Sequence, residues 1–331
     1  MQCGDSPIDL VYCWCDLADP VFRAKKEACA RALGIAFDGE ANSDCRYASN
    51  DELRYSLRSV EKFAPWVRRV FIVLNDESSP PQWLDCSCSR LSIVRLSDFI
   101  PHDCLPTFNS VTIEFSIPRI REISERFLYA NDDMFFASRV SQDFFFAKDG
   151  FPVFRYMDSR IDVDDCKSTS CYLQQLVTAY KFIRDELGKC GDFAQAYGRL
   201  PHHNVDAYLK SDMLAFIERF PDAVSRTIRQ QFRDPSQLQR EAFASYALAV
   251  GHGHFRRTMR PWYETMFGRP HRDSFYFSPG RKSLTRDFAR IRPRLFCMND
   301  NDAVTDEDRK SGRAFLEKMF PEPSSFERVG M

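Results

Sequence analysis

The chain has 331 residues, and its 46 Lys and Arg nearly balance its 47 Asp and Glu, which leaves a formal net charge of −1. This length allows a large buried core in one or two domains, and the balanced charge gives no global field of the kind that binds nucleic acid. No run of about 18 apolar residues occurs, so the sequence predicts no membrane span.

Strand and helix signals alternate through the first part of the chain. Residues 8–15 are an apolar strand candidate that ends at Asp16. Residues 21–46 are charged and Ala-rich, which predicts a helix followed by a flexible loop around residues 38–43.

A second helix is predicted to begin near Ser49. Ser49 and Glu52 lie three residues apart and fit a capping box, in which each side chain accepts a hydrogen bond from the other's backbone. Apolar side chains follow at helical spacing until Pro65. The next predicted elements are two strands and a helix interrupted at Pro118, over residues 70–74, 92–96 and 107–125.

Helical signals dominate the second half of the chain. Residues 152–157 and 294–298 predict two further short strands, and Asp234 and Gly251 predict the two ends of one helix. The expected helices are residues 171–187, 205–219, 236–250 and 306–320. The whole pattern predicts an α/β fold, with a helix-covered sheet followed by a mostly helical half.

The strongest functional signal is the run over residues 126–136. An apolar strand ends there in Asn131, Asp132 and Asp133, and aromatic residues follow at once. Two adjacent carboxylates repel each other unless a divalent cation or a basic group lies between them. Ligands also bind at strand ends in open α/β sheets. The alternative is a solvated turn that Asn131 and Asp132 cap.

Other polar clusters also stand where apolar segments stop. Each has an ordinary structural explanation, because Asp16 and Asp19 are common turn formers and Arg54 and Arg58 could share a solvated helix face. Their joint order is more informative, since carboxylates, arginines and a histidine suit transfer of a phosphate-linked group. The clusters contain Asp16, Asp19, Arg46, Asn50, Glu52, Arg54, Arg58, Asn109, Ser110, Glu114, His202, His203, Arg233, Asn299 and Asp300.

The cysteines and the N-terminal residues indicate in which cellular compartment the protein is expected. The 12 cysteines are scattered and contain no matched pair of C-x-x-C motifs, so they predict no structural zinc site. The N-terminal residues lack the apolar core of a signal peptide, so no disulfide framework is predicted either. We expect free cysteines and a cytoplasmic protein, with peripheral attachment to the inner face of the cell membrane left open.

Taken in order, these motifs resemble the Stealth family of sugar-phosphate transferases. That family includes bacterial capsular polysaccharide phosphotransferases and the catalytic subunit of the lysosomal-enzyme N-acetylglucosamine-1-phosphotransferase. Cys13, Cys15 and Leu17 depart from the usual Thr, Val and Gly of the first block, and Val205 replaces a Pro in the third. The four similar blocks are residues 8–20, 50–136, 201–233 and 296–300.

The resemblance implies a Rossmann-like, GT-A-like sheet that binds a nucleotide sugar and a metal over residues 1–157. Residues 158–331 would form a mainly helical part that completes the active site, or would continue the same catalytic domain. The implied reaction transfers a sugar 1-phosphate from a nucleotide sugar, expected to be a UDP-sugar, to a hydroxyl of an acceptor glycan, which could be lipid-linked. The implied context is capsule or exopolysaccharide synthesis.

Two alternatives stay open. One is a conventional metal-dependent glycosyltransferase, which moves only the sugar and leaves the diphosphate on the nucleotide. The other is a non-catalytic relative that binds nucleotide sugars. The identity of the released nucleotide separates the first from phosphotransfer.

The resemblance also assigns roles to single residues. Asp132 and Asp133 would hold Mg²⁺ or Mn²⁺, with Asp133 at the catalytic centre. His203 would be the general base, although the adjacent His202 leaves this assignment open, and Arg233 would bind phosphate oxygens. The residues expected to bind substrate are Asp16, Asp19, Arg54, Asn109, Glu114, His202, Asn299 and Asp300.

Overall fold

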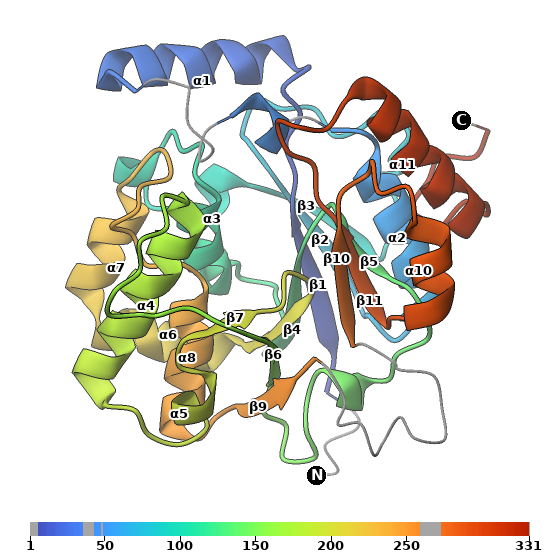
Figure 1. Cartoon of the computed structure of the whole chain (residues 1–331). Coiled ribbons are helices and arrows are strands. Elements are labelled where there is room, and N and C mark those ends of the chain that lie inside the picture. The colour runs from blue at the N-terminus through green and yellow to red at the C-terminus, as the bar shows by residue number, and fades with distance from the viewer. Residues whose placement is uncertain (1–5, 36–42, 48, 259–272, 331) are drawn as a thin grey trace.

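The computed structural model describes residues 6–35, 43–47, 49–258 and 273–330 (Figure 1). The loop predicted around residues 38–43 lies almost wholly outside these ranges. Within them, no helix is both long enough and apolar enough to cross a membrane.

The centre of the fold is a five-stranded sheet with the strand order β3-β2-β1-β4-β8. β1, β2, β3 and β4 run parallel, whereas β8 is antiparallel to β4. The residues of β1, β2 and β4 are almost all buried, as expected for parallel strands covered on both faces. The strands are β1 Ile8–Cys13, β2 Val70–Leu74, β3 Leu91–Arg95, β4 Arg126–Asn131 and β8 Asp206–Leu209.

Two three-stranded sheets flank the central one. The first has the order β10-β11-β5 and the second the order β7-β6-β9. The chain passes from β4 directly into β5, so the turn at Asp132 and Asp133 joins the central sheet to the first of them. Their strands are β5 Met134–Phe136, β6 Val153–Arg160, β7 Arg199–Pro201, β9 His254–Arg257, β10 Ser274–Phe277 and β11 Leu295–Met298.

The helices cover the central sheet from two sides (Figure 1). One side carries α3 to α8, and the other carries α2, α10 and α11, while α1 lies across one end. The first helices are α1 Pro20–Leu33, α2 Glu52–Phe63, α3 Ser110–Ser116, α4 Cys171–Leu187 and α5 Phe193–Ala196. The later helices are α6 Lys210–Arg219, α7 Pro221–Ile228, α8 Glu241–Val250, α10 Leu284–Ile291 and α11 Asp306–Met319.

Alternation along β1 divides the core in two. Val11 packs with the cluster that contains the helices from α3 to α8, whereas Leu10 and Tyr12 pack with α2 and the flanking strand β5. This follows from the strand geometry, in which successive side chains point to opposite faces. The predicted α/β class with a mostly helical second half is confirmed.

The division at residue 157 stays a prediction. Strands from both sides of that position share sheets, because β8 pairs with β4 and β11 pairs with β5. Formation of β8 also changes one predicted helix, since residues 205–219 begin as a strand and only Lys210–Arg219 is helical. Hydrogen bonding to the edge of β4 therefore decides the structure of residues 206–209, although their local sequence pattern is helical.

The predicted helix over residues 236–250 also begins later than expected, at Glu241. Tertiary hydrogen bonds hold the preceding segment: Gln237 is buried, its Nε2 donates to the carbonyl of Thr227 at 2.8 Å, and its Oε1 accepts from the amide of Asp234 at 2.9 Å. Asp234 therefore starts a turn rather than a helix. The predicted end is confirmed, with Gly251 in the left-handed conformation.

A buried carboxylate anchors the C-terminal segment to α2. Glu327 accepts hydrogen bonds from Arg54 Nε at 2.6 Å, from Arg58 Nε and Nη2 at 2.7 Å each, and from the Ser324 amide at 2.8 Å. Burial alone would raise the pKa of Glu327, but these donors hold it at about 2. The arginine pair therefore has a structural role, because it joins α2 to the segment around Glu327.

Replacing Glu327 with Gln should lower the unfolding free energy by about 2 kcal/mol at neutral pH. Because the pKa of Glu327 is lower in the folded state than in the unfolded state, the carboxylate stabilises the fold at pH values above its unfolded-state pKa. This stabilisation is lost as the pH falls toward its folded-state pKa. The difference in unfolding free energy between wild type and Glu327→Gln should therefore become smaller between about pH 5 and about pH 3, as measured by urea unfolding. The exposed Glu322→Gln is the matched control. If this difference in unfolding free energy did not change with pH, Glu327 would not be a carboxylate with a lowered pKa in the folded protein.

Candidate active site

A cavity of about 740 Å³ lies at the carboxyl ends of β1 and β4, where helices α3, α4 and α8 face the central sheet. This is the position at which open α/β sheets bind ligands. The predicted site residues on its wall are Glu114, Asp132, Asp133, His202, His203, Arg233, Asn299 and Asp300. The structure thus brings together residues separated by more than 180 positions in the sequence.

One wall of the cavity carries three carboxylates. Asp132 and Asp133 follow β4, and Glu52 is the first residue of α2. Burial raises the pKa of Asp132 well above its usual value, and the charges of Glu52 and Asp133 raise it further. Burial also raises the pKa of Glu52. A bound cation would relieve this crowding of negative charge.

Glu52 does not take part in the predicted capping box. The residue that precedes α2 is Asp51, in the left-handed conformation, and its side chain makes no capping bond. The Glu52 carboxylate instead accepts from the Asn50 amide at 2.6 Å and from Asn50 Nδ2 at 2.8 Å. These bonds direct an acidic group to the cavity wall, where sequence reasoning had placed a helix cap.

Asp133 is held from the neighbouring strand β11. Its Oδ2 accepts from Asn299 Nδ2 and from Cys297 Sγ, both at 3.2 Å. Among the described residues, its Oδ1 is buried without a hydrogen-bond partner. Together with Glu52 and Asp132 this unsatisfied oxygen fits a hard divalent cation such as Mg²⁺ or Mn²⁺, which prefers carboxylate oxygens.

Asn299 and Asp300 form the floor beside the acidic wall. Asn299 donates to Asp133 and accepts from the Tyr276 hydroxyl at 3.0 Å. Asp300 accepts from Arg309 Nε at 2.7 Å, so part of its charge is already compensated. Asn299 is therefore the better placed of the two to position the acidic wall.

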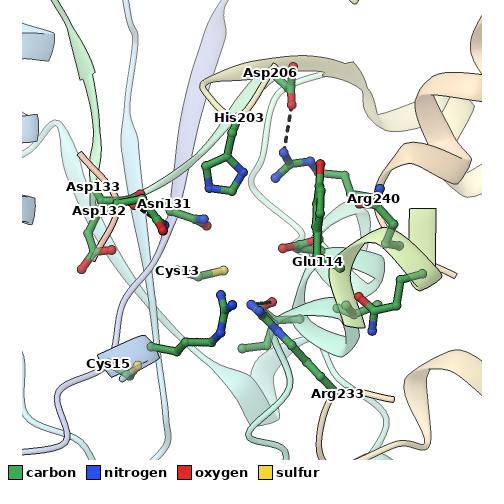
Figure 2. A pocket seen from close by; sticks show the side chains of 18 of the residues that line it. Cys13, Cys15, Glu114, Asn131, Asp132, Asp133, His203, Asp206, Arg233 and Arg240 are labelled. Carbon is green, nitrogen blue, oxygen red and sulfur yellow. Dashed lines mark hydrogen bonds and ion pairs between the residues drawn. The ribbon is translucent and has the colours of Figure 1, made fainter. Parts of the chain in front are cut away.

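His203 lies between the acidic wall and the arginines (Figure 2). Its ring meets Tyr172 and Tyr276 edge-on, with centroid distances of 6.3 Å and 5.6 Å. Burial, and then the charge of Arg240, lower the pKa of His203 to about 4. Its imidazole is therefore neutral at neutral pH and able to accept a proton.

His202 has a different environment. Its Nε2 contacts Asp206 Oδ1 at 2.8 Å, and the other oxygen of Asp206 pairs with Arg240 Nη2 at 2.9 Å. Its Nδ1 is buried and has no hydrogen-bond partner in the described part of the chain. The contact with Asp206 fixes the His202 ring, so His202 helps to position Asp206 and, through it, Arg240. His203 instead faces the centre of the cavity (Figure 2).

Two arginines supply positive charge opposite the acids (Figure 2). Arg233 Nη2 donates to Ser110 Oγ at 2.7 Å, at the first residue of α3. Arg240 pairs with Asp206, and its guanidinium carbon lies 4.6 Å from the centroid of the Tyr129 ring. The Tyr129 hydroxyl in turn donates to Glu114 at 3.1 Å. Asp132 and Asp133 therefore lie on one side of the cavity, and Arg233 and Arg240, with Glu114 and Asp206 beside them, lie on the other.

Four predicted substrate-binding residues do not line the cavity. Asp16 accepts from the Ala18 amide at 2.9 Å in a turn, and Asp19 caps α1 through the Val21 amide. Arg54 pairs with Glu327, away from the cavity. Asn109 is buried beneath the cavity wall. The structural explanations considered for Asp16 and Asp19 match their contacts here.

Asn109 supports the site indirectly. Its Nδ2 donates to the carbonyls of Gln230 at 2.9 Å and Phe232 at 3.0 Å, and its Oδ1 accepts from the Val111 amide at 3.1 Å. These bonds join the start of α3 to the segment that carries Arg233. Asn109 thus positions Arg233 without lining the cavity itself.

Replacing Asn109 with Ala should cost about 2–4 kcal/mol of unfolding free energy, because several buried backbone groups lose their partners. Thermal and urea unfolding would measure this loss. Ser236→Ala, an exposed change in the adjoining loop, should have little effect. A near-neutral Asn109→Ala would mean that water replaces the amide.

Sequence reasoning missed three contributors to the site. Arg240 and Asp206 drew no attention because neither belongs to a local motif. Cys297, which donates to Asp133, was expected only to be a free cysteine. A signal for Arg240 exists only in three dimensions, where it lies opposite the acidic wall. All described cysteines are free, as predicted.

Two conserved regions of the Stealth protein family match the chain. Conserved region 2 matches residues 46–154, and conserved region 4 matches residues 287–330. The first contains Asp132 and Asp133 of the acidic wall, and the second contains Asn299 and Asp300 of the floor. Both regions therefore bear directly on the cavity.

Curated bacterial relatives match almost the whole chain. "Exopolysaccharide phosphotransferase CpsY" of Mycobacterium leprae (strain TN) is 31% identical over 328 residues, which cover 97% of this chain and 57% of the relative. "Exopolysaccharide phosphotransferase SCO6023" of Streptomyces coelicolor (strain ATCC BAA-471 / A3(2) / M145) is 33% identical and covers 97% of this chain and 52% of that protein. The chain thus spans about half the length of the curated relatives it matches.

A solved structure also aligns along the whole chain. It is a complex of the galactosyltransferase LgtC with donor and acceptor sugar analogs, aligned over 96% of both chains at a TM-score of 0.44 and 10% identity. A likeness of this strength carries no argument about activity. The matches to two conserved regions and to the curated relatives do establish the family: this chain belongs to the Stealth protein family.

Proposed function

We propose that the protein transfers a sugar 1-phosphate from a nucleotide sugar to a hydroxyl of an acceptor glycan in exopolysaccharide or capsule synthesis. One observation carries the proposal: a single cavity sets Asp132 and Asp133 opposite Arg233 and Arg240, with the neutral His203 between them. Glu52 lines the same cavity, close enough to Asp132 to raise its pKa. The printed names of the curated relatives support the same reaction class. The cytoplasmic location expected from the sequence belongs to this proposal.

His203 is the proposed general base. A neutral imidazole nitrogen takes the proton from the acceptor hydroxyl, and the hydroxyl oxygen attacks the phosphorus that carries the sugar. A P–O bond forms to the acceptor as the P–O bond to the bridging oxygen of the diphosphate breaks. The nucleoside monophosphate leaves with that electron pair, and the product is a phosphodiester.

The arginines would bind the non-bridging phosphate oxygens. Arg233 is held by Ser110, and Arg240 by Asp206, so both guanidinium groups are positioned before substrate arrives. Preorganised cations of this kind stabilise charge that develops on phosphoryl oxygens during transfer. The same cations would also stabilise a departing nucleoside diphosphate, so the nucleotide that is released decides between the two reactions.

The acidic wall would hold Mg²⁺ or Mn²⁺. Asp132, Asp133 and Glu52 are the proposed ligands, because their crowded and buried carboxylates fit a hard cation. When bound, the ion supplies positive charge that neutralises the donor's diphosphate. Asn299 would keep Asp133 in place through its amide.

The experiment that tests the proposal identifies the nucleotide product. The full chain is incubated with a panel of UDP-sugars, Mg²⁺ or Mn²⁺ and an acceptor oligosaccharide, and the products are read by mass spectrometry. Release of the monophosphate together with an acceptor heavier by a sugar phosphate is the expected result. Release of the diphosphate would instead establish a glycosyltransferase, and binding without turnover of any donor would establish a non-catalytic relative.

A further inference from the structure

Three side chains from distant parts of the chain converge beside the acidic wall of the cavity: Asp133 and His203 line the cavity, and Cys297 is buried next to Asp133. Asp133 follows β4, His203 precedes β8 and Cys297 lies in β11. Each offers one oxygen, nitrogen or sulfur atom, and these three atoms lie within 4.8 Å of one another. This is the spacing of groups that can share one metal ion.

The three groups have capacity to bind an ion. Asp133 Oδ1 is buried without a partner in the described chain, and Cys297 Sγ already lies 3.2 Å from Asp133 Oδ2. The His203 ring is held by the edges of Tyr172 and Tyr276. No hydrogen bond within the described ranges occupies its ring nitrogens, so they are available to a ligand from the cavity.

The chemistry of this set differs from that of the acidic wall. A carboxylate, an imidazole and a thiolate form a mixed oxygen, nitrogen and sulfur site, which suits borderline-soft cations such as Zn²⁺ and not Mg²⁺. Three protein ligands also leave a fourth position to water in tetrahedral geometry. The carboxylates of Asp132 and Glu52 remain outside this set, on the hard-cation side.

We propose that Zn²⁺, or a cation of the same class, binds to Asp133, His203 and Cys297 and thereby switches the site off. Binding releases the thiol proton of Cys297 to solvent and forms a metal–sulfur bond. The same ion occupies the imidazole nitrogen of His203 and one oxygen of Asp133. Zinc therefore removes the proposed base and competes for a proposed ligand of the hard cation.

The binding step does not depend on the proposed transfer reaction and is tested without substrate. The purified, metal-free full chain is titrated with Co²⁺, a spectroscopic substitute for Zn²⁺. We expect a thiolate-to-cobalt charge-transfer band in the near ultraviolet, which added Zn²⁺ should abolish. Absence of this band, or a band that Zn²⁺ leaves unchanged, would overturn the proposal.

Variants identify the ligands. Cys297→Ser should remove the charge-transfer band, and His203→Ala should keep the band but weaken Co²⁺ binding by at least about 10–100-fold. Cys13→Ser is the matched control, because Cys13 is a thiol on the cavity wall that lies outside the ligand set. A band that survives Cys297→Ser, or that is lost in Cys13→Ser, would contradict the assignment. Cys297→Ala with a circular dichroism spectrum tests for loss of folding.

The regulatory step rests on the proposed function and has its own measurement. In the transfer assay with Mg²⁺, Zn²⁺ should inhibit the wild type and should be about 10–100-fold less potent against Cys297→Ser. Equal potency against both would refute the switch while leaving cobalt binding intact. An enzyme inactive with every donor would refute the proposed function, and the spectra would still report on the metal site.

Discussion

Replacing Asp133 with Asn is expected to lower metal-dependent turnover by about 10³-fold or more, because a ligand charge opposite the donor's diphosphate is lost. The amide keeps the volume of the side chain and can still accept from Asn299, so the fold should be unchanged. The rate is measured at saturating donor over a range of Mg²⁺ and Mn²⁺ concentrations, and folding by thermal unfolding.

The control for this variant is Asp185→Asn. Asp185 is exposed on α4 and pairs with its neighbour Arg184, so the same chemical change occurs far from the cavity. It should leave the rate close to wild type. Normal turnover in Asp133→Asn would remove the metal role from this residue and would move it to Asp132 and Glu52.

Replacing His203 with Ala should slow the chemical step by about 10²–10⁴-fold if its imidazole takes the acceptor proton. His202→Ala should cost less, because that ring contacts Asp206 and would act through the position of Arg240. Single-turnover rates with preformed enzyme and donor separate this step from product release. A large loss in His202→Ala with His203 dispensable would reverse the assignment.

The pH profile provides a second test of His203. Burial and the charge of Arg240 lower its pKa to about 4, so the base stays unprotonated from neutral pH down to about pH 5. The rate should therefore not fall over that range, whereas an imidazole with an ordinary pKa near 6.5 would lose activity there. A steep decline between about pH 7 and about pH 5 at saturating Mg²⁺, where the bound cation keeps the carboxylates of Asp132 and Glu52 ionised, would contradict a depressed pKa of His203.

Local sequence patterns predicted most of the regular structure, because burial imposes its period on the chain. The strand that reaches Asp132 and the helix over residues 171–187 were both visible as apolar patterns. Elements that depend on distant partners were not visible. The sequence of β8 has a helical pattern, but the segment forms a strand because it pairs with the edge of β4. Residues 236–240 also have a helical pattern, but the side chain of Gln237 makes hydrogen bonds with the backbone of Thr227 and Asp234 instead.

The same distinction between local sequence signals and distant contacts applies to the residues of the candidate site. The run at Asp132 and Asp133 is a local signal, and the structure puts it on the cavity wall. Glu52 has the same spacing from Ser49 whether it caps a helix or faces a ligand, so only the approach of α2 to the end of β4 distinguishes the two. Arg54 shows the converse, since its partner Glu327 is 273 positions away.

The pairing of β8 with β4 bears on any attempt to divide the chain for study. A fragment that stops at residue 157 would leave β4 as a bare outer strand, with amide and carbonyl groups open to another molecule. Such a fragment is expected to self-associate, and it would also lack both histidines, which enter the cavity just before β8. Truncation experiments should therefore retain residues up to at least Asp300, because β11 pairs with β5 and the cavity wall also includes Arg233, Arg240 and Asn299.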